Sequence, residues 1–243
     1  MGFESMFQMM KGLPGKLNSG VFGGMQGGQN SQQQAFLRRL HKEIRAEEAL
    51  SVPLDRMEAI VMDIETTGFF PDQGDEIISI GAVKIENGTI NEDKKFYSLI
   101  RYEKTLSPQI EQLTGLRGSQ LKEAPPLPEV LIEFFKFCEA RTIIAHHARH
   151  EKSFLQNASW KHFKAPLKHR IIDTSFLYRI AEPELNLQRL EDLCSHNGIP
   201  VMERHHALED ARLAAELWCC YISKVRDKGC MTLKDVYEKV ASL

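Results

Sequence analysis

Apolar residues along the chain form short runs that predict a β-sheet. The runs at 59–64, 77–85 and 95–100 are rich in apolar side chains and are separated by polar links, a pattern typical of strands. Strands that follow one another through short links favour an antiparallel meander. Two further short strands are predicted at 142–147 and 169–174. The sheet is therefore expected to have five strands.

Later segments carry apolar residues at helical spacing. Amphipathic helices are predicted at 128–140, 151–159, 175–181, 186–198, 206–225 and 231–240. Consecutive strands, followed by strands that alternate with helices, indicate an α/β fold in which helices cover a mixed sheet.

The patterns divide the chain into three parts. Residues 1–34 are rich in Gly, Gln and Ser and lack the apolar surface that stabilises a fold, so this segment is expected to be flexible. Residues 35–56 are interpreted as an amphipathic helix and a linker, and the helix is expected to pack on the domain rather than dock a partner. A compact domain is predicted over 57–243.

Composition narrows the class of protein. The formal net charge of −2 does not indicate a generic polyanion binder, so contact with nucleic acid requires a local basic patch. The 5 cysteines form no C-x-x-C pair, which favours a reducing, cytoplasmic location over a disulfide framework or a cysteine zinc site. Apolar runs fall short of the ~20 residues that span a bilayer, and a membrane partner is not expected.

Two carboxylates stand at the end of the first predicted strand. Asp63 and Glu65 are two positions apart, so both side chains leave the same face while Ile64 points the other way. Neighbouring carboxylates repel one another unless cations hold them. A surface pair at a strand end is the ordinary alternative. The apolar segment and the small, polar turn at 66–68 favour a functional placement instead.

Histidines and acids form two further clusters. The stretch "HHARHEKSFL" at 146–155 could hold a transition metal by itself, but His146 and His147 are expected to point to opposite sides of a strand. His205 and His206 precede or open a predicted helix, and Asp210 lies near its start. An acid there can simply favour the helix dipole.

Four sequence blocks together resemble a known family. "DIETTG" at 63–68, "H-x-A-x-x-x-x-x-F-L" at 146–155, "IDT" at 172–174 and "H-x-A-L-x-D-A" at 205–211 occur in family order and at family-like distances. This pattern resembles the DEDDh 3′→5′ exonucleases, which include the proofreading epsilon subunit of bacterial DNA polymerase III. The resemblance covers roughly residues 58–222 and implies a ribonuclease-H-like fold.

The resemblance assigns roles to individual residues. It implies that the catalytic set is Asp63, Glu65, Glu151, His205 and Asp210, with the four acids as metal ligands. The "H-x-A-L-x-D-A" frame favours His205 over His206. Glu151 departs from the family pattern, which has aspartate there; it keeps the charge and adds one methylene, so the metal geometry would change.

The resemblance also implies a mechanism. Two divalent ions, Mg²⁺ or Mn²⁺, about 3.5–4 Å apart would assist phosphodiester hydrolysis, and their charge would balance the four acids. His205 would act as general base, since an unperturbed imidazole has a pKa of about 6.5. Thr66, Gly68 and His147 are candidates for contacts with the substrate.

A basic segment flanks the second block. Seven Lys or Arg and one acid, Glu151, lie between Arg141 and Arg170, and this segment could guide a phosphate backbone toward the metals. A solvated helix face is the ordinary alternative. Trp160 and Phe163 are interpreted as core residues rather than stacking platforms.

Three functions stay open on the sequence. The leading hypothesis is a 3′→5′ exonuclease acting on DNA, with single-stranded DNA bearing a free 3′ end as its partner and a role in DNA replication or repair. An RNA exonuclease with the same machinery is the near alternative, and a nucleic-acid-binding or scaffold protein with a degenerate site is the other. A polymerase or repair partner could bind the N-terminal segment.

Overall fold

The computed structural model describes residues 29–46 and 50–243 of the chain. Most of the segment predicted to be flexible, 1–34, lies outside the described residues. The helix predicted from residue 35 is α2, Gln29–Ala46, so residues 29–34 are helical. Leu37 and Leu40 of α2 are buried against the domain, as expected for a helix that packs on it.

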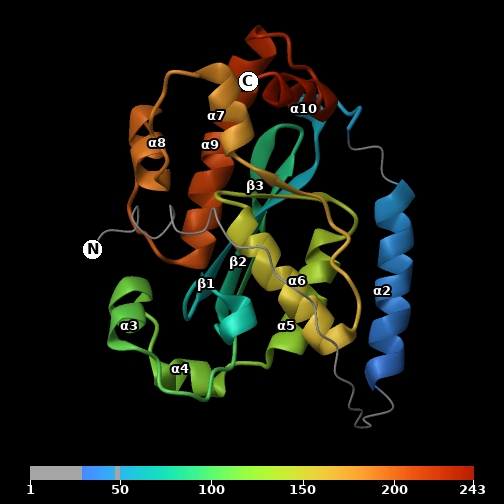
Figure 1. Cartoon of the computed structure of the whole chain (residues 1–243), viewed down its shortest axis with the longest axis vertical. Coiled ribbons are helices and arrows are strands. Elements are labelled where there is room, and N and C mark those ends of the chain that lie inside the picture. The colour runs from blue at the N-terminus through green and yellow to red at the C-terminus, as the bar shows by residue number, and fades with distance from the viewer. Residues whose placement is uncertain (1–28, 47–49) are drawn as a thin grey trace.

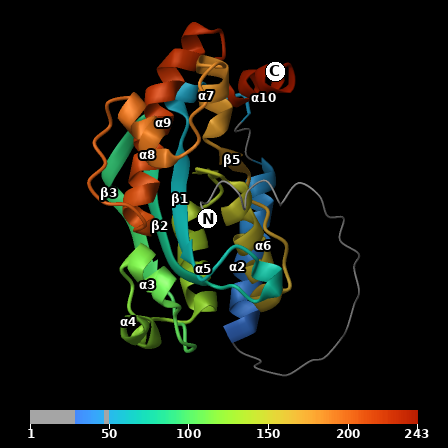
Figure 2. The same ribbon diagram turned by 60° about the vertical axis from the view of Figure 1, so that its left-hand side comes forward.

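One mixed sheet forms the centre of the molecule. Its strands are β1 (Ala59–Thr66), β2 (Ile77–Glu86), β3 (Thr89–Leu99), β4 (Thr142–Ala145) and β5 (Ile171–Asp173), in the order β3-β2-β1-β4-β5. The first three are antiparallel, whereas β4 and β5 run parallel to β1. The predicted α/β fold, with a mixed five-stranded sheet flanked by helices, is confirmed (Figures 1 and 2).

Helices cover both faces of this sheet. The helices of the domain are α3 (Pro108–Thr114), α4 (Gly118–Glu123), α5 (Leu127–Cys138), α6 (Arg149–Phe163), α7 (Ser175–Ala181), α8 (Leu190–His196), α9 (Ala207–Asp227) and α10 (Leu233–Ala241). Ala59 and Val61 of β1 share a core with α7 and α9, whereas Ile60 and Met62 share one with α5 and α6. Burial on both faces explains why the strand reads as a continuous apolar run.

Several predicted boundaries were wrong. Strand β3 begins at Thr89, not at 95, because its first half is an exposed sheet edge whose polar side chains carry no strand pattern. Strand β4 ends at Ala145, two residues before the predicted end. Helices α3 and α4 were not predicted, because they are too short for a clear periodicity. Leu121 of α4 and Leu106, which precedes α3, form a small apolar cluster with Ile78 of β2.

Gly81 allows α9 to approach the sheet. A Cβ at this position would lie 2.2 Å from the backbone of Ala207 and Leu208, at the start of α9. Gly81 is also the partner of Asp63 across the β1–β2 pair. The missing side chain thus lets the N-terminus of α9 settle directly beside the end of β1.

Within the described part of the chain, no helix has the length and apolar character needed to cross a membrane.

We predict that Gly81→Ala destabilises the protein by about 3 kcal/mol or more, because backbone cannot move away as a side chain could. Gly118→Ala is the matched control, since its Cβ would meet only Glu111 Oε1 at 3.9 Å. Urea unfolding should show the control within about 1 kcal/mol of wild type. Equal stability of Gly81→Ala and wild type would contradict the close approach.

Candidate functional site

The carboxyl ends of two neighbouring parallel strands, β1 and β4, bring candidate residues to one edge of the sheet. Asp63 and Glu65 belong to the last half of β1 and share the face of the sheet that α9 covers. The pairing of β1 with β2 shifts between Glu65 and Thr66, where the chain leaves the sheet. Residues 146–151 follow β4 at the same edge. Parallel strands thus place blocks that are distant in sequence side by side.

Two helix starts complete the acidic set. Glu151 lies in the first turn of α6 and is 3% exposed, and Asp210 lies in the first turn of α9 and is 4% exposed. The positive end of a helix dipole favours an acid at both places. Glu151 Oε2 and Asp210 Oδ1 are buried and find no hydrogen-bond partner among the described residues. Buried carboxylate oxygens without partners are available to cations.

Electrostatic coupling shows that the four acids converge. Burial raises the pKa of Asp63 well above its ordinary value, and Glu65, Asp210 and Glu151 raise it further. Burial and then Asp210 raise the pKa of Glu65 to about 8. Burial also raises the pKa of Glu151, and the charges of Asp173 and Glu65 add to this effect. Each of these three pKa shifts disfavours the ionised carboxylate, and added positive charge would relieve the repulsion.

His205 lies beside these acids in a constrained backbone conformation. Its φ of 62° is in the left-handed region, and its N–H donates to Asp210 Oδ2 at 3.1 Å. One ring nitrogen of His205, one oxygen of Glu65 and one of Asp210 all lie within 4.8 Å of one another. Burial and then Arg204 lower the pKa of His205, so its imidazole is neutral at neutral pH.

His206 takes a different direction from His205. It is the N-cap residue of α9, and its ring stacks on that of Tyr97 from β3, with 4.6 Å between the ring centroids. The geometry therefore places His205, and not His206, with Glu65 and Asp210.

Arg204 is a site residue that the sequence did not reveal. Its guanidinium forms an ion pair with Asp210, and its Nη2 lies 3.1 Å from Glu191 Oε2. Its charge also lowers the pKa of Asp63 and Glu65. An arginine in a loop before His205 has no periodic signal that gives its direction, so only the folded chain shows that it enters the acidic cluster.

His146 and His147 do not have the side-chain directions that the sequence predicted. His146 and His147 follow β4 rather than extend it, and their ring centroids are 4.2 Å apart, so the prediction that they point to opposite sides of a strand was wrong. Both ring nitrogens of His146 have partners, Thr174 Oγ1 and the carbonyl oxygen of Gln188, each at 2.9 Å. Burial, followed by the charge of His147, lowers the pKa of His146 to about 3. A metal site centred on His146 would have to break these contacts.

The turn after β1 borders the acidic cluster. The Thr66 hydroxyl donates to the carbonyl oxygen of Gly68 at 2.6 Å and lies 3.4 Å from His150 Nε2. A Cβ on Gly68 would lie 2.4 Å from the carboxylate of Asp75, which accepts a hydrogen bond from the Phe70 N–H. Asp75 thus holds the turn, and the sequence patterns did not single it out. Contacts of Thr66, Gly68 and His147 with a substrate stay predictions.

The donor set fits hard divalent cations. Asp63, Glu65, Glu151 and Asp210 offer oxygen ligands, which suit Mg²⁺ or Mn²⁺, and two of them have oxygens without partners in the described structure. Arg204 supplies one positive charge, which is less than the negative charge of the four carboxylates when all are ionised.

The family model for exonucleases matches residues 60–218. The chain belongs to this exonuclease family. The match includes each of the five candidate positions, and the resemblance to DEDDh exonucleases is thereby confirmed.

The chain is similar in sequence to parts of several bacterial proteins. It is 32% identical over 179 residues to a DNA polymerase III PolC-type from Caldanaerobacter subterraneus, covering 74% of this chain and 12% of the relative. It is 31% identical over 193 residues to a DNA polymerase III subunit epsilon-like protein of Rhodobacter capsulatus, covering 77% of this chain and 27% of that protein. The chain therefore spans only a small part of these relatives.

Solved structures share the fold. The nuclease domain of 3′hExo, a DEDDh family member bound to rAMP, aligns with a TM-score of 0.60 and 20% identity over 73% of this chain and 95% of that chain. Exonuclease X, in complex with 5′ overhanging duplex DNA, aligns with a TM-score of 0.58 and 19% identity over 74% of this chain and 99% of that chain.

We predict an unusual pH dependence of stability in the presence of a chelator. The pKa of Glu65 in the folded state, about 8, lies above its ordinary value of 4.5. Its contribution to stability is therefore complete below pH 4.5 and is lost as the pH rises toward 8. Between pH 5 and pH 8, wild type should lose on the order of 3 kcal/mol relative to Glu65→Gln.

Urea unfolding at each pH measures this difference. Exposed Glu184 provides the control, because Glu184→Gln should follow wild type. Added Mg²⁺ should reverse the trend, since a cation binds the ionised carboxylates. Parallel pH curves for wild type and Glu65→Gln in chelator would show that Glu65 is not buried among other acids.

Proposed function

We propose that this protein is a 3′→5′ exonuclease that hydrolyses phosphodiester bonds at the 3′ ends of nucleic acids, with DNA as the favoured substrate. The convergence of four carboxylates and a neutral imidazole at one edge of the sheet carries the proposal. The relatives support it, because they are named DNA polymerase III PolC-type, DNA polymerase III subunit epsilon-like protein and, at 32% identity, 3′-5′ exonuclease DinG.

Asp63, Glu65, Glu151 and Asp210 would hold two divalent cations. When bound, such ions supply Lewis-acid stabilisation of the attacking and leaving oxygens. The protein's own task is to hold the acids in place: α6 and α9 present Glu151 and Asp210 from their first turns, and the Gly81 contact fixes the start of α9.

His205 would act as the general base. The lowered pKa keeps its imidazole neutral, so the ring can take a proton from the attacking water at neutral pH. The hydrogen bond from its backbone N–H to Asp210 ties the position of the ring to that of a ligand. Arg204 would offset part of the acidic charge before cations enter.

Glu151 is proposed as a working ligand rather than a sign of decay. Its carboxylate is buried beside Glu65, and one oxygen finds no partner among the described side chains. A degenerate site would not need to bury an unpartnered acid, because such burial is costly. The extra methylene of glutamate reaches the cluster from the start of α6.

The substrate contacts and partners complete the proposal. Thr66 and Gly68 would contact the terminal nucleotide from the turn beside the site, and His147, which follows β4, would contact it as well. Because the PolC-type relatives are polymerases by name, a polymerase is the proposed partner in replication or repair. RNA is the second candidate substrate, and a direct assay separates the two.

Purified protein should shorten a 5′-labelled single-stranded 20-mer stepwise from its 3′ end with Mg²⁺ or Mn²⁺, and not with chelator. Asp63→Asn should lower the rate by roughly 100-fold or more, because it removes a charged ligand. Glu151→Gln should do the same, whereas Glu151→Asp should stay within about tenfold of wild type. Denaturing gels of DNA and RNA 20-mers provide the measurement.

Glu184→Gln, which changes an exposed glutamate outside the cluster, is the control for charge alone. No shortening of either polymer with either ion would refute the proposed function. Full activity of Glu151→Gln would refute the assignment of Glu151 and leave the other ligands standing.

A further inference from the structure

The outer face of α6 carries a stripe of long side chains. Arg149, Lys152, Gln156, Trp160 and Lys164, the last being the C-cap residue, are all exposed. Their spacing of three to four residues places them within about a third of the helix circumference. These five residues are called the α6 stripe below. It runs for about 22 Å along the helix.

Positive charge on the α6 stripe is not compensated. Arg149, Lys152 and Lys164 form no ion pair within the described part of the chain, and Glu151, the one acid of α6, faces the protein interior. Lys161 at the margin is likewise unpaired there, and the nearby Asn157 donates to Asp72. A face on which free cations outnumber acids attracts a polyanion.

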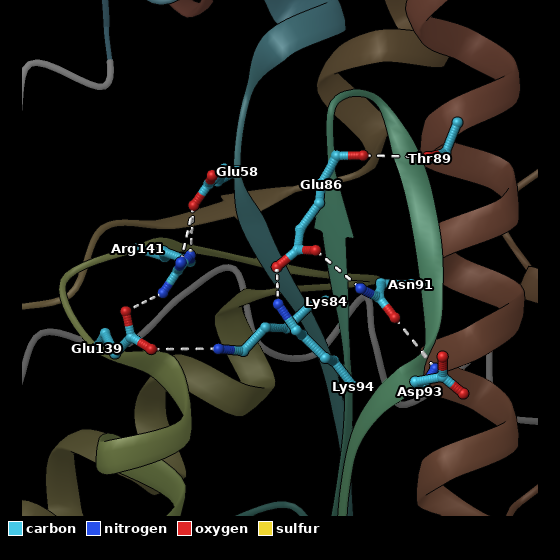
Figure 3. A network of polar contacts seen from close by, with 9 residues as sticks. All are labelled: Glu58, Lys84, Glu86, Thr89, Asn91, Asp93, Lys94, Glu139 and Arg141. Carbon is cyan, nitrogen blue, oxygen red and sulfur yellow. Dashed lines mark hydrogen bonds and ion pairs between the residues drawn. The ribbon is translucent and has the colours of Figure 1, made fainter.

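Arg141 does not belong to this basic surface, although it belongs to the basic segment of the sequence. It precedes β4, at the opposite edge of the sheet from the acids, and its guanidinium forms ion pairs with Glu58, at 2.8 Å, and with Glu139 (Figure 3). Lys84 pairs with Glu139 in the same network, at 3.3 Å. Of the seven cations in that segment, Arg149, Lys152 and Lys161 lie on α6 and Lys164 is its C-cap residue, whereas Lys168 and Arg170 lie beyond it.

Trp160 gives the α6 stripe an aromatic surface. The prediction that Trp160 and Phe163 are core residues was right for Phe163 and wrong for Trp160, which is 59% exposed. Burial of a Trp side chain in a core contributes several kcal/mol, and this residue forgoes most of it. Cations interleaved with an exposed aromatic ring are the chemistry that binds single-stranded nucleic acid, because bases stack on the ring while cations contact phosphates.

The α6 stripe starts beside the acidic cluster. Arg149 and Lys152 flank Glu151 in the first turn of α6, and His150 of that turn lies 3.4 Å from Thr66. The helix then leads away from the site. A strand whose 3′ end lies among the acids can cross the start of α6 and continue along its outer face, past Trp160.

We propose that the α6 stripe binds the single-stranded segment upstream of the 3′ end, with Trp160 stacking on a base. This proposal rests on the proposed function for the placement of the 3′ end. At the 3.4 Å spacing of stacked nucleotides, the α6 stripe spans about six phosphates. It therefore makes the protein prefer strands of several nucleotides over a mononucleotide ester.

Binding of a labelled 20-mer in chelator tests the α6 stripe without catalysis. Trp160→Ala should weaken the binding of single-stranded DNA and RNA by about 5- to 100-fold, the effect of losing one stacked base. Lys152→Glu combined with Lys164→Glu should weaken it at least tenfold and reduce the slope of log affinity against log salt by about 0.7 per lost phosphate contact. Fluorescence anisotropy measures both.

Matched controls change equivalent side chains elsewhere. Lys228→Glu combined with Lys239→Glu alters two exposed lysines near α10, and Met231→Ala removes an apolar side chain that is 46% exposed. Both controls should bind the 20-mer as wild type does. Hydrolysis of the p-nitrophenyl ester of thymidine 5′-monophosphate, which tests the acidic cluster alone, should be equal in wild type and both controls.

The outcomes separate this proposal from the proposed function. Wild-type affinity of the α6-stripe variants for both 20-mers would overturn the role of α6, whether or not the protein cleaves them. Weakened binding in those variants, together with no cleavage by wild type, would uphold the α6 stripe and refute the exonuclease. A loss confined to duplex DNA would also overturn the proposal, because it predicts contact with unpaired bases.

Discussion

Burial raises the pKa of Asp63, Glu65 and Glu151, and the mutual repulsion of these carboxylates and Asp210 raises it further. Folding must therefore hold together groups that repel one another. The surrounding structure meets this requirement with rigid elements: a central strand, two helix starts and a glycine contact. A cluster that is costly to form without cations is well suited to bind them, since cation binding recovers the electrostatic cost.

Two of the acids show how the backbone offsets part of this cost. Glu151 and Asp210 lie in the first turns of α6 and α9, where the helix dipole is positive. Gly81 brings α9 against β2 directly opposite Asp63, so the dipole acts at short range. Arg204 adds one formal positive charge to the same cluster. The positive charge of the two helix starts and of Arg204 together remains smaller than the negative charge of four ionised carboxylates.

Sequence patterns predicted the sheet well where both of its faces are covered. Strands β1 and β2 read as apolar runs because helices bury them, whereas the exposed half of β3 carries no such signal. The five candidate site positions followed from motif order and spacing, and the fold brings them to one edge of the sheet. Family resemblance supplied that order; composition alone did not.

The roles of Arg204 and Asp75 depend on where their side chains point in the folded protein, which the sequence pattern does not give. Arg204 enters the cluster from a loop, and Asp75 holds the turn at Gly68 through a contact that is local only in three dimensions. Trp160 is an instructive error. The predicted helix ends at residue 159, whereas α6 continues to Phe163 and turns Trp160 about 240° from Phe154, away from the core.

The central claim is that the buried acids exist to hold two divalent cations. A crystal structure of the protein with Mn²⁺ and a nucleoside 5′-monophosphate, with anomalous diffraction recorded for manganese, tests it most directly. We expect two peaks about 3.5–4 Å apart, coordinated by Asp63, Glu65, Glu151 and Asp210, with Arg204 withdrawn from Asp210. The absence of manganese from these four carboxylates, with Arg204 still paired to Asp210, would contradict the account.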